Sequence, residues 1–270
     1  MIVCRSAAEL DRMRAANQLV ASVLVALEAA VAPGVTTEDL DRLAERLVRA
    51  GGGEPAFKGY RGFPATLCAS INDEVIHGIP SPARALKAGD IISLDVGAKL
   101  HGYYGDSAVT VPVGAVPEGT ATLLRVTRES LDRAIAQVRV GGRLSDIGHA
   151  VQQWVESHGF SIVREFVGHG IGSELHEEPQ IPNYGDPGRG PRLSEGMVLA
   201  IEPMVNLGGA GVKVLRDGWT AVTSDRSLSA HFEHTVAVTS DGVEVLSLPE
   251  RKRAKEQNNE GTSVSQAHLR

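Results

Sequence analysis

The sequence predicts an α+β protein in which two similar halves, residues 1–117 and 118–249, form one domain. Three observations support this prediction. At two places an amphipathic segment ends at a Pro-Gly or Gly-Gly pair. Short apolar runs separated by Gly and Pro follow each helical region. The residues around the two end points have the same types in the same order. Two such halves packed about a pseudo-twofold axis share a cleft, so we expect a functional site between them.

The first half begins with two predicted helices. Residues 6–32 form the first, which Pro33-Gly34 stops. Residues 37–49 form the second, which the capping signal Thr36-Thr37-Glu-Asp39 precedes and a Gly run ends. Strand candidates follow at residues 66–71, 91–96 and 107–111, because these runs are rich in apolar and β-branched side chains and bounded by turn residues.

The second half repeats this order. Residues 118–140 carry apolar side chains at helical spacing, and Ser145 is the predicted cap of a further helix that runs to Ser157. Segments 33–40 and 141–147 have a stop, a polar cap, an acid and an apolar residue in the same order. This similarity indicates an internal duplication of roughly 110 residues.

Composition narrows the class of protein. The chain has 270 residues, of which 42% are hydrophobic, and a net charge of -6, so we expect no broad basic surface and no nucleic-acid partner. The two cysteines favour a reducing compartment over a disulfide framework. The most apolar stretch, residues 19–31, is too short for a membrane span, and Arg5 interrupts the N-terminal apolar run, so we expect a cytoplasmic protein.

Residues 250–270 are polar and lack apolar periodicity, which predicts a disordered tail. The tail begins with a cluster of four basic residues between Arg251 and Lys255. A solvated tail is the interpretation we favour, and contact with rRNA or another acidic surface is the alternative.

Five side chains spread over both halves have the chemistry of a metal site: Asp95, Asp106, His169, Glu202 and Glu233. Asp95 follows an apolar run, Asp106 ends a Gly-rich turn segment, and we expect the carboxylates at strand ends. Buried carboxylates are costly unless they are paired or bound to a cation. Four carboxylates and one imidazole are a hard ligand set that suits divalent Mn, Fe, Co or Zn, and their number favours two ions over one.

The motifs around these residues resemble a known family from about residue 5 to residue 248. They include Gly59-Tyr-Arg-Gly-Phe-Pro64, Cys68-Ala-Ser-Ile-Asn72, Val75-Ile-His-Gly-Ile-Pro80, Asp90-Ile-Ile-Ser-Leu-Asp95, Gly168-His-Gly-Ile-Gly172, Gly196-Met-Val-Leu-Ala-Ile-Glu-Pro-Met204 and Phe232-Glu-His234. The chain is similar to the methionine aminopeptidases of the bacterial type I class, in peptidase family M24. That resemblance implies the pita-bread fold, a central curved antiparallel sheet covered by helices, and a monomer.

The resemblance also implies roles for the five residues. Asp106 and Glu233 would bridge two divalent metal ions, Asp95 would hold one ion, and His169 and Glu202 would complete the other. A water between the ions would attack the first peptide bond, with Glu202 as its proton acceptor.

Two further histidines gain roles in the same way. His176 would stabilise the developing oxyanion, and His77 would contact the scissile amide nitrogen or the next residue. The substrates would be the N-termini of nascent polypeptides whose initiator methionine precedes a small residue, and the ribosome is a candidate contact.

Aromatic and sulfur-bearing side chains match the family's methionine pocket: Phe57, Tyr60, Phe63, Cys68 and Trp219. Departures from the family cluster in this region. Family members often have Cys at Phe57, Tyr at Phe63, Cys at Ile76 and Phe at Leu175. The ligand set matches throughout, so the departures concern the shape of the pocket.

Other interpretations stay open at this point. Each acid alone could form a turn or an ion pair, and the aromatic residues could be ordinary core. The same fold and metals also serve X-Pro aminopeptidases and creatine hydrolases, which generally carry an additional N-terminal domain. Relatives that have lost their ligands act as binding modules, whereas this chain retains all five.

Overall fold

The computed structural model describes residues 1–249, so the predicted tail lies outside the described residues. The first half contains the helix pair, a short 3₁₀ turn and five strands. In order these are α1 (Ala7–Ala30), α2 (Thr37–Ala50), β1 (Glu54–Pro55), η1 (Tyr60–Gly62), β2 (Leu67–Ile71), β3 (Glu74–Ile76), β4 (Ile91–Leu100) and β5 (Tyr103–Pro112).

The second half contains the other helix pair and ten strands, most of them short. They are α3 (Glu118–Ile135), α4 (Leu144–Ser157), β6 (Ser161–Ile162), β7 (Gly168–Gly170), β8 (Glu177–Ile181), β9 (Val198–Ile201), β10 (Met204–Asn206), β11 (Val212–Val214), β12 (Ala221–Thr223), β13 (Ser229–His231), β14 (Glu233–Thr239) and β15 (Gly242–Val245).

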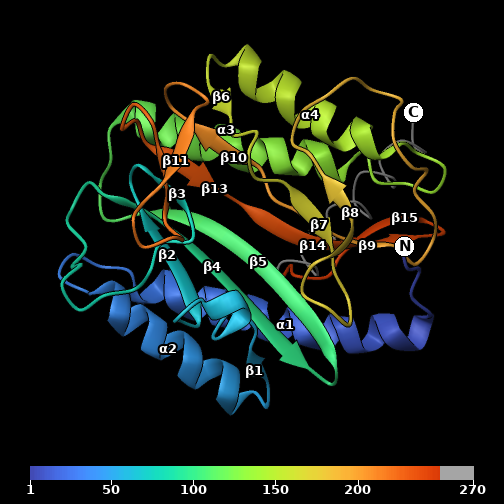
Figure 1. The fold of residues 1–270 in the computed structure, drawn as a ribbon, viewed down its shortest axis with the longest axis horizontal. Helices are drawn as coiled ribbons and strands as arrows, with labels where there is room; N and C mark the ends of the chain where they lie inside the picture. The colour runs from blue at the N-terminus through green and yellow to red at the C-terminus, as the bar shows by residue number, and fades with distance from the viewer. Residues whose placement is uncertain (250–270) are drawn as a thin grey trace, which may run out of the picture.

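The two halves meet in one antiparallel sheet of nine strands. Its main path is β1-β4-β5-β14-β9-β7-β8, with β2 on β4 and β15 on β14. The long β4 and β5 curve through the middle of the molecule, α1 and α2 lie along one side, and α3 and α4 lie along the other (Figure 1). This arrangement confirms the predicted α+β class and the pita-bread fold.

Each helix pair covers its half of the sheet with a separate core. Leu27, Leu40 and Leu94 belong to a buried cluster that joins α1 and α2 to β2 and β4. Leu131 and Ile147 belong to the corresponding cluster under α3 and α4. Apolar burial is the main favourable term in folding, so each core holds its helices against its half of the sheet. The two halves of the sheet join where β5 pairs with β14.

The helix boundaries agree with the prediction at most ends. Thr36 caps α2 as predicted, because its side chain accepts the Asp39 amide at 3.1 Å. Two details were wrong. Arg143, not Ser145, is the cap of α4, and the Ser145 hydroxyl bonds the backbone of Arg189 instead.

The third helix also ends earlier than predicted. It stops at Ile135 because the Gln137 and Val138 amides bond to carbonyls three residues back, which tightens the chain into turns before Gly141. Apolar periodicity alone does not distinguish such a turn from a further helical turn.

The prediction that the carboxylates sit at strand ends was wrong for two of them. β4 and β5 are ten residues each and pair along their whole length, so Asp95 and Asp106 lie inside strands. The turn between them is at His101 and Gly102, both with positive φ. Of the glycines in this segment, Gly102 forms the turn, whereas Gly97 and Gly105 lie within the strands where other residues pack closely against the backbone.

Candidate metal centre

Strand register brings three of the acids onto one face of the sheet. Ala108 of β5 pairs with Asp95 of β4 on one side and with Glu233 of β14 on the other. Asp106 lies two residues before Ala108 on the same strand, so its side chain points to the same face. Antiparallel pairing thus gathers carboxylates from residues 95, 106 and 233 into adjacent positions on the sheet.

The other two candidate ligands come from neighbouring strands. His169 of β7 pairs with Ala200 of β9, and Glu202 follows two residues later, just after β9 ends. The flanking Gly168 and Gly170 allow this approach, because a side chain at either position would overlap the backbone carbonyl of Ala200 or Glu178. The Gly-His-Gly motif is therefore a packing requirement of the strand that presents the imidazole.

The hydrogen bonds of His169 orient its ring toward the acids. Its Nδ1 lies 2.9 Å from the Gly170 carbonyl oxygen, which can only accept a proton. Nδ1 therefore carries the hydrogen, and the Nε2 lone pair faces the centre, 3.7 Å from Glu202 Oε1. Burial lowers the pKa of His169 to about 4, so the ring is neutral and suited to bind a metal ion.

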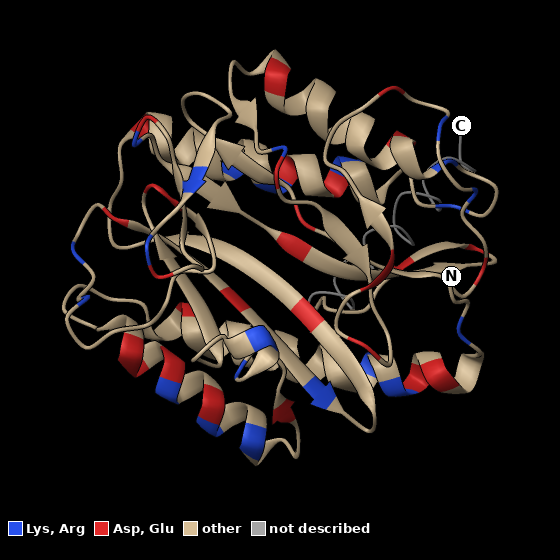
Figure 2. Ribbon diagram, viewed as in Figure 1, with Lys and Arg blue, Asp and Glu red and all other residues tan. Residues whose placement is uncertain are grey.

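The acids are close together in a dry environment. Burial first, and repulsion between the acids second, raise the pKa of Asp95, Asp106 and Glu233 well above their ordinary values. Burial also raises the pKa of Glu202 to about 8. Figure 2 shows acidic segments on the central strands of the sheet, and Arg61 lines the same cavity as these acids.

These residues fit divalent cations. One oxygen each of Asp95, Asp106 and Glu233 has no hydrogen-bond partner among the residues that the structure describes. One ligand atom from each of Asp106, His169 and Glu233 lies within 4.8 Å of the others. Cations would satisfy these oxygens and offset both the burial of the acids and their mutual repulsion.

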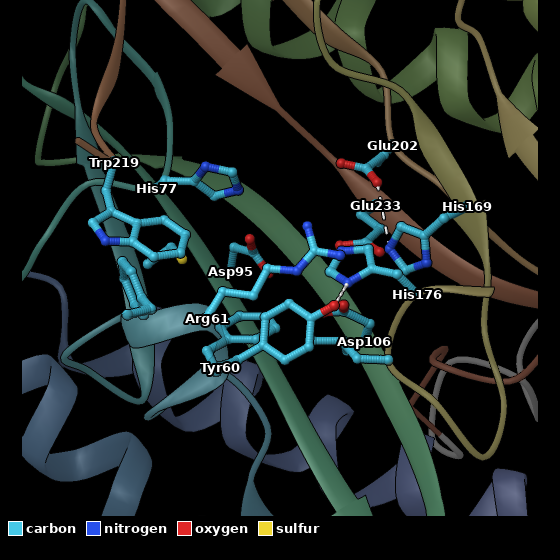
Figure 3. A pocket seen from close by; sticks show the side chains of 14 residues that line it. Tyr60, Arg61, His77, Asp95, Asp106, His169, His176, Glu202, Trp219 and Glu233 are labelled. Carbon is cyan, nitrogen blue, oxygen red and sulfur yellow. Dashed lines mark hydrogen bonds and ion pairs between the residues drawn. The ribbon is translucent and has the colours of Figure 1, made fainter. Parts of the chain in front are cut away.

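The acids form one wall of a cavity of about 170 Å³. Figure 3 shows Trp219 on the opposite side of the cavity from Glu202 and Glu233, with the Arg61 side chain extending toward the carboxylates. The lining contains every residue that the sequence analysis singled out for the site: Phe57, Tyr60, Phe63, Cys68, His77, Asp95, Asp106, His169, His176, Glu202, Trp219 and Glu233. The structure therefore brings the whole predicted set together in one cavity.

The two further histidines stand beside the acids. His176 Nδ1 lies 2.8 Å from the Tyr60 hydroxyl, and its ring centre is 4.3 Å from that of His169 (Figure 3). His77 has a positive φ of 59° and packs edge-on against Trp219 at 6.0 Å. Burial lowers the pKa of His77 to about 4, so this ring is also neutral.

Sequence reasoning missed three residues of this region. Arg61 lines the cavity and stacks over Tyr60 at 5.3 Å, and no local pattern distinguished it from a surface arginine. Leu175 lines the cavity but was noted only as a departure from the family. His231 is buried 3.5 Å from Glu202, and its position two residues before Glu233 was the available signal.

Comparisons with known proteins place the chain in a family. The model of metallopeptidase family M24 matches residues 11–240. A methionine aminopeptidase of Clostridium acetobutylicum is 53% identical over 250 residues, which cover 93% of this chain and all of that protein. The crystal structure of a methionine aminopeptidase from Thermotoga maritima superposes with a TM-score of 0.91 at 48% identity, covering 92% of this chain and all of that one.

A more distant likeness concerns the fold alone. The prolidase of Pyrococcus furiosus superposes with a TM-score of 0.72 at 22% identity, and the match covers 92% of this chain and 66% of that one.

Fold, ligand set and family match together define a metallopeptidase: the chain belongs to family M24. Within that family it groups with the methionine aminopeptidases, as the sequence resemblance implied, and it is therefore a hydrolase. No helix among residues 1–249 is long and apolar enough to cross a membrane.

Proposed function

We propose that the chain removes the initiator methionine from nascent polypeptides whose second residue is small, with two divalent metal ions held by five side chains. One observation carries the proposal. Four carboxylates and a correctly oriented imidazole converge on one wall of a cavity whose other wall is aromatic. A metal-dependent hydrolase needs the first wall, and recognition of a thioether side chain favours the second.

In this proposal Asp106 and Glu233 would each serve both ions, Asp95 would help to hold one, and His169 and Glu202 would help to hold the other. When bound, the ions would acidify the attacking water and polarise the carbonyl of the first peptide bond. Their identity follows cellular supply, because Mn, Fe, Co and Zn all suit oxygen and imidazole donors.

The chain's own side chains handle the protons. Glu202 accepts a proton from the water as it attacks the carbonyl carbon, and then passes that proton to the leaving amine as the carbon–nitrogen bond breaks. His176 donates from Nε2 to the oxyanion. The Tyr60 hydroxyl, 2.8 Å from His176 Nδ1, supports this role because a hydroxyl that donates to Nδ1 leaves the hydrogen on Nε2.

Substrate choice depends on the opposite wall. Phe57, Phe63 and Trp219 provide apolar surface, and Cys68 lies buried on β2 opposite Asp95. The Phe63 and Trp219 rings meet edge to face at 5.2 Å and so form a packed aromatic surface against which an apolar side chain could lie. His77 packs against Trp219 and is placed to contact the scissile amide or the next residue.

The test is a panel of Met-X peptides with X from Gly to Trp, assayed on metal-free protein to which one metal at a time is added. We expect turnover only with metal and only for small X. An Ala-Pro peptide serves as the matched control for the X-Pro activity that the fold also supports. Metal-replete protein that is inert on every Met-X peptide, or prefers Ala-Pro, contradicts the proposal.

The cellular setting is part of the same proposal. We propose a monomer of one domain, residues 1–249, that works in the cytoplasm at the N-termini of emerging chains. Contact with the ribosome would use the domain surface or residues 250–270. Sedimentation with ribosomes at increasing salt, with and without residues 250–270, tests this contact.

A further inference from the structure

One buried histidine near the metal centre is not used by the proposed reaction. His231 ends β13 and is 1% exposed. Neither of its ring nitrogens has a hydrogen-bond partner within residues 1–249. Burying an imidazole with both nitrogens unpaired is unfavourable, and an apolar side chain of similar size would fill the same space without this penalty.

The backbone of His231 is held firmly. Its amide donates to the Thr110 hydroxyl at 2.8 Å, and that hydroxyl donates to the His231 carbonyl at 2.7 Å. The residue also pairs with Met204 of β10. These contacts fix the backbone of His231 between β5 and β10, so the fold determines which way the ring points.

That direction leads to Glu202. His231 Nε2 lies 3.5 Å from Glu202 Oε2, while the other oxygen, Oε1, lies 3.7 Å from His169 Nε2. The carboxylate thus stands between two imidazoles. Since the hydrogen of His169 is on Nδ1, His231 is the one of these two imidazoles whose Nε2 is available to donate a hydrogen to Glu202.

We infer that His231 is a positioning residue for Glu202: its Nε2–H donates to Oε2 and fixes the plane of the carboxylate, leaving Oε1 toward His169 and the cavity. This inference rests on the proposed role of Glu202 as proton acceptor. His231 does not line the cavity, so it acts on the reaction through Glu202 and not through the substrate. It should therefore influence kcat much more than KM.

Two variants of the full-length, metal-loaded protein test the inference. His231→Leu keeps an apolar side chain but removes the donor, and His231→Gln restores an N–H donor. With the Met-Ala-Ser peptide, bound metal measured for each sample and folding checked by thermal unfolding, we expect His231→Leu to lower kcat about 10- to 100-fold with KM changed less than about threefold. His231→Gln should recover to within about fivefold of the parent.

A second readout is independent of turnover. Nitrogen-15 spectra of the histidines in metal-free and Zn²⁺-loaded protein identify the tautomer of His231, and we expect the hydrogen on Nε2 with a shift in Glu202→Gln. A hydrogen on Nδ1, unchanged kcat in His231→Leu, or a folded His231→Gln as defective as His231→Leu would each overturn the inference. If the parent protein cleaves no Met peptide, the proposed function fails, while the tautomer still decides the contact between His231 and Glu202.

Discussion

The two walls of the cavity are built on different kinds of backbone. The metal-binding wall projects mainly from long paired strands, with Asp95 and Asp106 inside β4 and β5 and Glu233 at the start of β14. The aromatic wall comes largely from irregular segments, with Tyr60 in a short 3₁₀ turn and Trp219 after the β11 strand. The difference teaches that sheet register fixes the positions of the candidate ligands, whereas loops position the side chains that face them across the cavity.

The departures from the family follow this division. All five candidate ligands match, while three of the four changed positions, Phe57, Phe63 and Leu175, line the cavity. A shifted ligand would lose its partners in the sheet, because moving a strand by one residue turns every side chain to the other face. Substitutions in the two walls should therefore differ in the size and in the kind of their effects.

The largest effect is expected from the metal-binding wall. Asp106→Asn should lower kcat/KM at least about 1,000-fold and reduce bound metal, since it removes a carboxylate proposed to bridge two ions. The same change should leave the metal-free protein at least as stable as the parent, because it relieves repulsion from Glu202. Metal analysis, turnover and thermal unfolding of both proteins measure these effects.

Asp186→Asn is the matched control, because Asp186 is exposed and lies outside the cavity. It should behave as the parent in all three measurements. An Asp106→Asn protein that binds two ions per chain would contradict the assignment of Asp106.

The pH dependence of stability gives the next effect. Burial raises the pKa of Glu202 from 4.5 to about 8 in the folded chain. The stability that comes from its protonated form is therefore complete below pH 4.5 and is lost as pH rises through about 8. The histidines with lowered pKa, His77, His169, His176 and His231, favour folding as pH rises, and this effect fades above their ordinary pKa of 6.5. The raised pKa values of Asp95, Asp106 and Glu233 act in the same direction as that of Glu202, so metal-free protein should be less stable at pH 8 than at pH 6.5.

Urea unfolding at the two pH values, with chelator or with Mn²⁺, checks this expectation. Bound metal should offset the loss, because it favours the ionised carboxylates. Metal-free protein that gains stability over the same interval would show that burial does not raise the pKa of Glu202 in this way.

The same division explains what the sequence could predict. The helices, the α+β class and the residues of the site followed from periodicity, stop signals and motif resemblance, and the structure brings those residues into one cavity. The sequence did not predict that Asp95 and Asp106 lie inside strands, because the pairing of β4 with β5 is a long-range property that local turn signals do not encode.

Contacts between distant segments were also beyond the sequence. The pairing of Tyr60 with His176 and the approach of His231 to Glu202 join residues far apart in the chain. Each residue alone has an ordinary interpretation as core or surface, so only the packed geometry distinguishes it.

The link between the walls should give an intermediate effect. Tyr60→Phe keeps the ring but removes the hydroxyl 2.8 Å from His176 Nδ1, so His176 is no longer held with its hydrogen on Nε2. We expect kcat to fall about 3- to 10-fold with little change in bound metal. Tyr104→Phe is the control, because Tyr104 is a partly buried tyrosine outside the cavity. A Tyr60→Phe variant with the kcat of the parent would show that the contact between Tyr60 and His176 does not affect the reaction.

The smallest effect on the chemistry is expected from the aromatic wall alone. Phe57→Cys restores the residue that family members often have and enlarges the cavity beside Gly97, where the Phe57 ring packs. Discrimination between Met-Ala and Leu-Ala peptides should fall about two- to fivefold, because a larger apolar pocket rejects a branched side chain less well. The kcat for Met-Ala and the metal content should change less than about twofold, since no ligand moves.

Phe160→Cys makes the same chemical change at a partly buried position of the α3–α4 core, so it should lower stability without altering discrimination. If Phe57→Cys changed metal content as much as Asp106→Asn, the loops would control the ligands as well, and the two walls would be one unit.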